Sequence, residues 1–389
     1  MGDACGAEGD PRLAGRGRRL RGQPAQSIRR AELQPAILAW APLGDPEGSP
    51  AAMSAAPGAP LPRNGLVTEP TPRRRRGVRC SAMCGSTPTA AIEPARADYN
   101  ATVVGLRRLH EDLLVLRVRP DAGVPARRGG QFTLLGLSPS EPLVEGCHDR
   151  TLRQPSPAAL IKRAYSLCSS LVDARGRLLR PEDEDCMEFY IALVRDDDPR
   201  VPSLTGRIFA LTPHRRIWTL GRILGNYTLE GVAAGDAVLF LATGTGEAPH
   251  NAMILDLARA GHRGPVASVV CVRRQRDLGY LQQHRRLEDL WPRYRYVSLT
   301  TREPERPPER LQDLLRSDEL EPRLGLGLDP ASTHVFVCGN PRMVGAPRPG
   351  RDGARTYSAE GGVVEILEAR GFTADTRSRR GNLHYEAFG

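Results

Sequence analysis

The run from Arg163 to Ser169 combines an arginine, a tyrosine and two serines with the alternation of a β-strand. Alternate residues of a strand share a face, so Arg163 and Tyr165 are expected to point one way and Ser166 the other. An arginine can bind a phosphate through both arms of its guanidinium, and a tyrosine ring can lie against an aromatic system. With a serine hydroxyl that can hydrogen-bond a ring edge, these side chains suit a flat, charged, redox-active ligand.

Two glycine-containing turns each follow an apolar run typical of a buried strand. The turn Thr243-Gly244-Thr245-Gly246 comes after residues 238–242, and Cys338-Gly339 ends the run 334–338. Ligands of parallel sheets bind at the carboxyl ends of strands, where glycine lets the backbone approach and helix-start amides favour a phosphate. Each turn alone also fits an ordinary strand-to-helix connection, and Cys338 alone fits a small core residue.

The segments around these motifs predict two domains of different class. Strands are expected at 99–106, 112–118, 131–137, 163–168, 188–194, 216–220 and 227–229, with a short helix at 202–211. Many short strands with few helices indicate a small antiparallel β-barrel over 96–234. Strands are then expected at 238–242, 266–272, 294–300 and 334–338, and helices at 250–260, 279–290, 308–315 and 361–368. This alternation predicts a doubly wound parallel sheet, an α/β domain over 235–389.

The composition narrows the class of protein. Although the net charge is +10, Lys162 is the only lysine, and much of the arginine lies in the first 80 residues, so nucleic-acid binding is not expected. The eight cysteines are scattered, without the spacing of a disulfide framework or an iron–sulfur site. No run is apolar enough to span a membrane. We expect a cytoplasmic monomer with reduced cysteines and no metal site.

Residues 1–95 are rich in arginine, proline, alanine and glycine, and are predicted to be a disordered tail. An export signal after Arg29-Arg30 is a weaker alternative, because Glu32 and two prolines interrupt the apolar run. A third alternative is an over-long start, since Met53 and Met83 both precede the first strand.

Together, and in this order, R-x-Y-S at Arg163, T-G-T-G-x-x-P at Thr243 and C-G-N-P at Cys338 resemble the motifs of the ferredoxin–NADP reductase family. The bacterial single-chain branch is the most similar, and the resemblance covers about residues 97–389. It implies a barrel that binds FAD and an α/β domain that binds NADP(H). It also implies hydride transfer from NADPH to FAD, and single-electron exchange with a ferredoxin or flavodoxin that must be a separate protein.

The resemblance implies the FAD-binding residues. Arg163 would hold the pyrophosphate, Tyr165 would stack on the isoalloxazine, and Ser166 would hydrogen-bond near flavin N5. Further FAD contacts are implied at Ala164, Leu167, Cys168, Tyr190, Ser203, Leu204, Thr205, Thr245 and Phe388. Tyr165, Ser166 and Cys338 are the implied catalytic residues.

The resemblance also implies the NADP-binding residues. Gly244, Gly246, Cys338 and Gly339 would lie beside the nicotinamide. The 2′-phosphate needs positive charge, which is implied at Arg273, Arg274, Arg302 and Arg310, and Thr301 is a further implied NADP contact. The alternative is that these arginines are ordinary solvated surface residues. An acidic residue in place of Arg273 would have favoured NAD over NADP, and none is present.

Several alternatives stay open. Glu247 can touch the nicotinamide region or be an exposed loop acid, and His384 can approach the flavin or be structural. The same modules serve NAD(P)H-dependent reductase components of oxygenases, and a non-enzymatic binding module on this fold is a third possibility.

The C-terminus departs from its relatives, which end in an aromatic residue over the flavin. This chain ends Phe388-Gly389, so either Phe388 takes that place or the flavin face is partly open. An open face would admit oxygen, so we predict that Gly389→Trp lowers the oxygen-dependent consumption of NADPH. Equal oxidase rates for wild type and variant would contradict the open face.

Overall fold

The computed structural model describes residues 98–148, 159–195, 203–317, 319–349 and 355–388. The expectations for residues 1–95 and for Gly389 therefore lie outside the described residues. Within the described part of the chain, no helix is long and apolar enough to cross a membrane.

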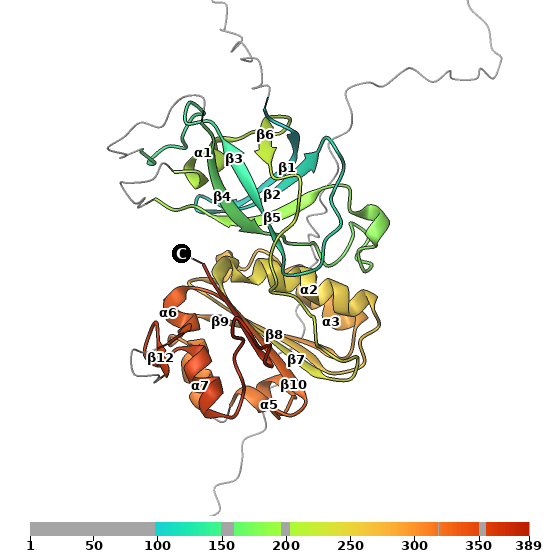
Figure 1. The fold of residues 1–389 in the computed structure, drawn as a ribbon, viewed down its shortest axis with the longest axis vertical. Coiled ribbons are helices and arrows are strands. Elements are labelled where there is room, and N and C mark those ends of the chain that lie inside the picture. The colour runs from blue at the N-terminus through green and yellow to red at the C-terminus, as the bar shows by residue number, and fades with distance from the viewer. Residues whose placement is uncertain (1–97, 149–158, 196–202, 318, 350–354, 389) are drawn as a thin grey trace, which may run out of the picture. The chain divides into compact units, whose positions relative to one another are not determined.

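The first domain is built on a six-stranded antiparallel sheet (Figure 1). Its strands are β1 (Ala101–His110), β2 (Leu113–Pro120), β3 (Phe132–Leu137), β4 (Ile161–Ser166), β5 (Met187–Ala192) and β6 (Arg216–Thr219), in the order β4-β3-β6-β1-β2-β5. Beyond the end of β4, the Cys168 amide donates to the Glu188 carbonyl of β5 at 2.8 Å, which joins the two edges of the sheet. The expected antiparallel barrel is thus confirmed.

Alternating apolar residues fill the barrel, and helix α1 (Thr205–Ala210) contributes Ile208 and Phe209 to its core. A 3-10 turn, η1 (Pro181–Asp183), lies between β4 and β5. Strand β2 is also buried on its second face, where Leu113 and Val115 pack with Tyr280 of the α/β domain. This contact explains why β2 shows an almost continuous apolar run in place of strict alternation.

The second domain is built on a five-stranded parallel sheet in the order β13-β10-β7-β8-β9. The strands are β7 (Ala237–Thr243), β8 (Val266–Val272), β9 (Tyr294–Thr300), β10 (Thr333–Gly339) and β13 (Leu383–Ala387). The helices are α2 (Glu247–Arg259), α3 (Leu281–Leu290), α4 (Leu311–Arg316), α5 (Leu320–Leu324), α6 (Pro341–Val344) and α7 (Val363–Ala369). Turns η2 (Gly244–Gly246) and η3 (Gln275–Asp277) and the hairpin β11 (Pro347–Pro349) and β12 (Arg355–Tyr357) complete the domain.

Strand alternation divides the core of this domain between the two faces of the sheet. Leu239 and Leu241 of β7 face a cluster that includes residues of α4, α5 and α7. Val238 and Phe240 face the other cluster, with residues of α2 and α3. Helices therefore cover both faces, and the predicted doubly wound α/β domain is confirmed (Figure 1).

Some expected elements differ from the structure. Residues 227–229 form no strand, because the Tyr227 hydroxyl bonds His250 of α2 at 2.8 Å and draws this segment onto the α/β domain. Helix α2 begins at Glu247, three residues before its expected start. Strand β13 and helix α5 were not expected, since both are short and β13 mixes His384 and Glu386 with its apolar residues.

The core predicts the cost of removing a central ring. Phe240 and Phe336 are fully buried and stack with their ring centroids 5.3 Å apart. We expect Phe240→Ala to lower the free energy of unfolding by about 3–5 kcal/mol, measured by urea denaturation. The control Val194→Ala, at a side chain that is 48% exposed, should change it by less than about 0.5 kcal/mol. Equal stability of the two variants would contradict this core.

Candidate active site

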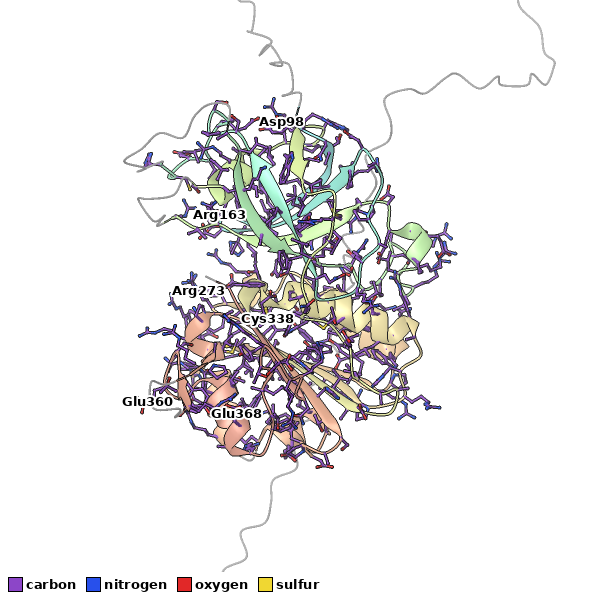
Figure 2. All side chains as sticks on the ribbon, in the orientation of Figure 1. Asp98, Arg163, Arg273, Cys338, Glu360 and Glu368 are labelled. Carbon is purple, nitrogen blue, oxygen red and sulfur yellow. The ribbon has the colours of Figure 1, made fainter. Side chains whose placement is uncertain are left out.

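The two glycine turns meet where the parallel sheet changes direction of winding. The chain moves from β7 outward to β8 and β9 and then returns to place β10 on the other side of β7. Such a switch point is where sheets of this class bind ligands, at the carboxyl ends of the strands. Cys338 and Arg273 mark this edge of the sheet in Figure 2, which also labels Arg163 on the barrel.

The turns pack backbone against backbone, which requires glycine at two positions. A Cβ at Gly246 would lie 2.3 Å from the Cys338 carbonyl oxygen, and Gly339 has φ +132°, a region that disfavours other residues. A hydrogen bond also joins the two turns, because Thr243 Oγ1 accepts from the Asn340 amide at 2.8 Å. A Cβ at Gly244 would meet no atom within 4 Å, so this side of the turn is open to a ligand.

On the barrel, β4 presents the residues of the opening motif. Tyr165 is half-buried and its ring meets the ring of Phe189 edge-on, with centroids 6.5 Å apart. Arg163 Nη1 donates to the Lys162 carbonyl at 2.8 Å, while Ala164 is exposed. The half-buried tyrosine has the partly accessible ring that a stacked ligand requires.

The structure adds Glu386, which the sequence reasoning missed. Strand β13 pairs with β10 so that Glu386 lies opposite Cys338. Burial raises the pKa of the Glu386 carboxyl from 4.5 to about 7, whereas the nearby Ser166 hydroxyl acts to lower this pKa. The Oε2 atom of Glu386 is buried without a hydrogen-bond partner among the described residues. Serine, cysteine and glutamate from three strands thus come together, with a carboxyl that can exchange a proton near neutral pH.

Cys338 and Phe388 frame this group. The Cys338 side chain is fully buried, and burial, reinforced by the charge of Glu386, raises the pKa of its thiol well above the usual range. The thiol is therefore neutral. The Phe388 amide donates to the Gly339 carbonyl at 2.8 Å, which holds this half-buried ring beside the second turn.

The expected pyrophosphate loop uses its side chains for local structure. Ser203 Oγ accepts from the Gly206 amide at 3.1 Å, and Thr205 Oγ1 accepts from the Val194 amide at 3.2 Å. Leu204 is buried in the barrel core. Both hydroxyls therefore support the local main chain.

Arginines gather beyond the ends of β8 and β9. The Arg302 amide donates to the Arg273 carbonyl at 2.8 Å, and the Thr301 amide donates to the Val272 carbonyl at 3.0 Å. The side chains of four nearby arginines are exposed: Arg273, Arg274, Arg302 and Arg310. The two loops are therefore joined, and both carry exposed arginines.

Other expected site residues lie in the contact between the barrel and the α/β domain. Tyr190 is 5% exposed, and its hydroxyl donates to the Asp277 carbonyl at 2.8 Å and accepts from the Gly279 amide at 3.0 Å. The amides of Leu167 and Cys168 bond carbonyls of Gln131 and Glu188 within the barrel, which leaves no amide proton at either position for a ligand.

Two of the open alternatives are settled by burial. Glu247 is 1% exposed, so its interpretation as an exposed loop acid was wrong. His384 is buried between Asp375, at 2.8 Å, and His334, at 3.1 Å, which makes it structural. No cluster of metal-ligating side chains occurs in the described ranges.

Comparison with known proteins agrees with this geometry. The family described as "Oxidoreductase NAD-binding domain" matches residues 240–348. The flavodoxin/ferredoxin–NADP reductase of Escherichia coli strain K12 is 30% identical over 219 residues, covering 55% of this chain and 75% of its own length. The ferredoxin–NADP reductase of Pseudomonas aeruginosa is 26% identical over 255 residues, or 63% of this chain and 86% of its own.

Solved structures share the fold. A ferredoxin NADP⁺ reductase from Neisseria gonorrhoeae, with bound FAD and NADP, superposes with a TM-score of 0.55 at 21% identity, covering 75% of this chain and 99% of its own. A cytochrome P450 reductase from Amycolatopsis gives 0.51 at 19% identity, covering 75% and 69%.

A barrel followed by an α/β domain with this switch-point site defines a FAD- and NAD(P)-binding oxidoreductase. The chain belongs to the ferredoxin/flavodoxin–NADP reductase family.

The raised pKa of Glu386 predicts a pH dependence of stability. Between the ordinary pKa of 4.5 and about 7, the folded state binds more protons here than the unfolded state. The contribution of Glu386 is then largest below pH 4.5 and decreases as the pH rises through 7. Glu386→Gln, which stays neutral, should reduce the loss of unfolding free energy between about pH 5 and pH 8.

Urea denaturation at both pH values measures this loss. The exposed control Glu360→Gln should keep the wild-type pH dependence. An unchanged pH dependence in Glu386→Gln would contradict the assignment.

Proposed function

We propose that this chain is an NADPH-dependent FAD reductase that exchanges single electrons with a separate ferredoxin or flavodoxin. The observation that carries the proposal is the meeting of Ser166 from the barrel with Cys338 and Glu386 at the switch point. The names of the Escherichia coli and Pseudomonas aeruginosa relatives support the choice of partner.

The residues present fit a flavin. Glu386 has a buried oxygen without a partner among the described residues, and Gly244 borders open space. Arg163 and the main chain of residues 203–205 would hold the pyrophosphate, while Tyr165 and Phe388 would flank the ring system. FAD, when bound, connects the two-electron chemistry of a nicotinamide to the one-electron chemistry of a protein carrier.

Each group of residues has a distinct task in the proposed reaction. The main chain at Gly244, Gly246 and Gly339 lets the nicotinamide lie against the turns, because no side chain covers them. Arg273 and Arg302 bind the 2′-phosphate, with Arg310 as a further positive charge. The Glu386 carboxyl carries a proton beside the Ser166 hydroxyl. The buried Cys338 side chain keeps water away from this carboxyl.

The alternative function is that of a reductase that serves an oxygenase. The cytochrome P450 reductase from Amycolatopsis shares the fold of this chain. The two functions are distinguished by the partner protein that the reductase reduces. Purified protein with NADPH should reduce a ferredoxin or a flavodoxin, and NADH should be a much poorer donor. Reduction of neither carrier with either donor, together with reduction of an oxygenase component, would favour the second function.

The paired arginines predict a change in specificity. Each charge-assisted contact that is lost costs about 1.5–3 kcal/mol, so Arg273→Ala/Arg302→Ala should raise the KM for NADPH at least tenfold. The kcat should change little, because the 2′-phosphate is remote from the reacting atoms.

The KM for NADH should stay unchanged in the same variant. Arg263→Ala, an exposed arginine before the start of β8 and so at the opposite end of the sheet, is the control. Equal loss of affinity for NADPH and NADH would contradict the assignment.

A further inference from the structure

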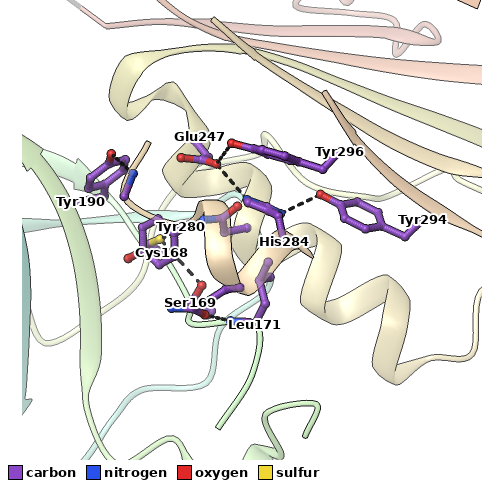
Figure 3. A network of polar contacts seen from close by, with 12 residues as sticks. Cys168, Ser169, Leu171, Tyr190, Glu247, Tyr280, His284, Tyr294 and Tyr296 are labelled. Carbon is purple, nitrogen blue, oxygen red and sulfur yellow. Dashed lines mark hydrogen bonds and ion pairs between the residues drawn. The ribbon is translucent and has the colours of Figure 1, made fainter. Parts of the chain in front are cut away.

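A buried polar network lies directly behind the first glycine turn (Figure 3). Glu247 follows Gly246 as the first residue of α2 and is 1% exposed. Its Oε1 atom lies 2.8 Å from Nε2 of the fully buried His284 and accepts from the Tyr296 hydroxyl at 3.0 Å. The Tyr294 hydroxyl lies 2.7 Å from the other ring nitrogen of His284, Nδ1.

The tyrosine hydroxyls fix the direction of these hydrogen bonds. Burial raises the pKa of Tyr294 and Tyr296 well above the usual range, and the charge of Glu247 adds to this, so both hydroxyls keep their protons. With the His284 proton on Nε2, Tyr294 donates to Nδ1, and His284 and Tyr296 donate to the carboxylate. Every contact then has one donor and one acceptor, and the Glu247 carboxylate accepts two hydrogen bonds.

No arginine or lysine pairs with Glu247 within the described ranges. Glu247 forms no ion pair with an arginine or lysine there, and its Oε2 atom is buried without a hydrogen-bond partner. Glu188, the other buried carboxylate in this region, differs because Arg117 Nε lies 2.7 Å from it. Glu247 therefore lacks the arginine partner that Glu188 has.

The field of Glu247 reaches the barrel. Burial is the main cause of the raised pKa values of Cys168 and Tyr190, and the charge of Glu247 contributes to both. Cys168 comes two residues after Ser166, at the end of the strand that carries the opening motif. It also meets α2 directly, because Asn251 Nδ2 lies 3.8 Å from its sulfur atom.

We propose that Glu247 supplies a buried negative charge that lowers the reduction potential of FAD, and that the hydrogen bonds from His284 and Tyr296 stabilise this charge. Reduction adds negative charge to a flavin. A fixed carboxylate nearby makes this addition less favourable and so lowers the reduction potential. A lowered potential suits a reductase whose partner is a low-potential one-electron carrier. The inference rests on the proposed function, since it takes the flavin to lie along β4.

The test is the midpoint potential of the bound flavin in wild type and Glu247→Gln. A unit charge acting over about 12 Å at an effective dielectric constant of about 20 changes an equilibrium constant about tenfold. Glu247→Gln should therefore favour the reduced flavin by up to about tenfold, which is a rise of about 30 mV for a two-electron couple.

Two controls separate charge from packing. Tyr294→Phe removes a hydroxyl of the network and keeps the carboxylate, and Glu360→Gln removes an exposed carboxylate of the same domain. Both should keep the wild-type potential, while thermal unfolding of the apoproteins reports how far each change disturbs packing. An equal rise in potential for Tyr294→Phe and Glu247→Gln would overturn the proposal.

A second variant covers the case in which Glu247→Gln does not fold. Glu247→Met/His284→Leu/Tyr294→Phe/Tyr296→Phe replaces the whole network by apolar side chains, so that no member of it is left buried without a partner. It should raise the potential in the same direction. If the variant folds, binds FAD and keeps the wild-type potential, the role of Glu247 is wrong but the proposed function stands. If the wild-type protein itself binds no FAD, the proposed function is wrong.

Discussion

The close packing of two glycine turns is the constraint on which the site depends. Gly246 lies against the Cys338 carbonyl and Gly339 lies against Thr243, so strands β7 and β10 can end side by side without side chains between them. This contact fixes the start of α2 and leaves Gly244 facing open space. It also sets the register in which β13 places Glu386 opposite Cys338.

A second constraint is the polar contact between the barrel and the α/β domain. The Tyr280 hydroxyl donates to Glu188 at 2.8 Å, and Tyr190 bonds the segment 277–279. Buried hydrogen bonds of this kind are directional, and they are costly to leave unmade. They hold β4 and the glycine turns in one arrangement, so Ser166 can reach Glu386. The site is thus assembled from both domains.

The local motifs could be predicted from the sequence, because Arg163, Gly244 and Cys338 each lie within a short segment whose neighbours reveal its backbone. Glu386 could not, since its strand is short, partly polar and paired only through the distant β10. One interpretation made Glu247 an exposed loop acid, because the helix was expected to begin only at residue 250. Glu247 is buried because its partners His284 and Tyr296 lie 37 and 49 residues further along the chain.

The central claim is that the barrel binds a flavin which NADPH reduces. The most direct measurement is the absorbance spectrum of the purified protein, recorded without oxygen before and after addition of NADPH. The account predicts flavin absorbance that bleaches with NADPH and returns when a ferredoxin or flavodoxin is added. A protein without flavin absorbance after incubation with FAD, or a bound flavin that NADPH leaves oxidised, would contradict it.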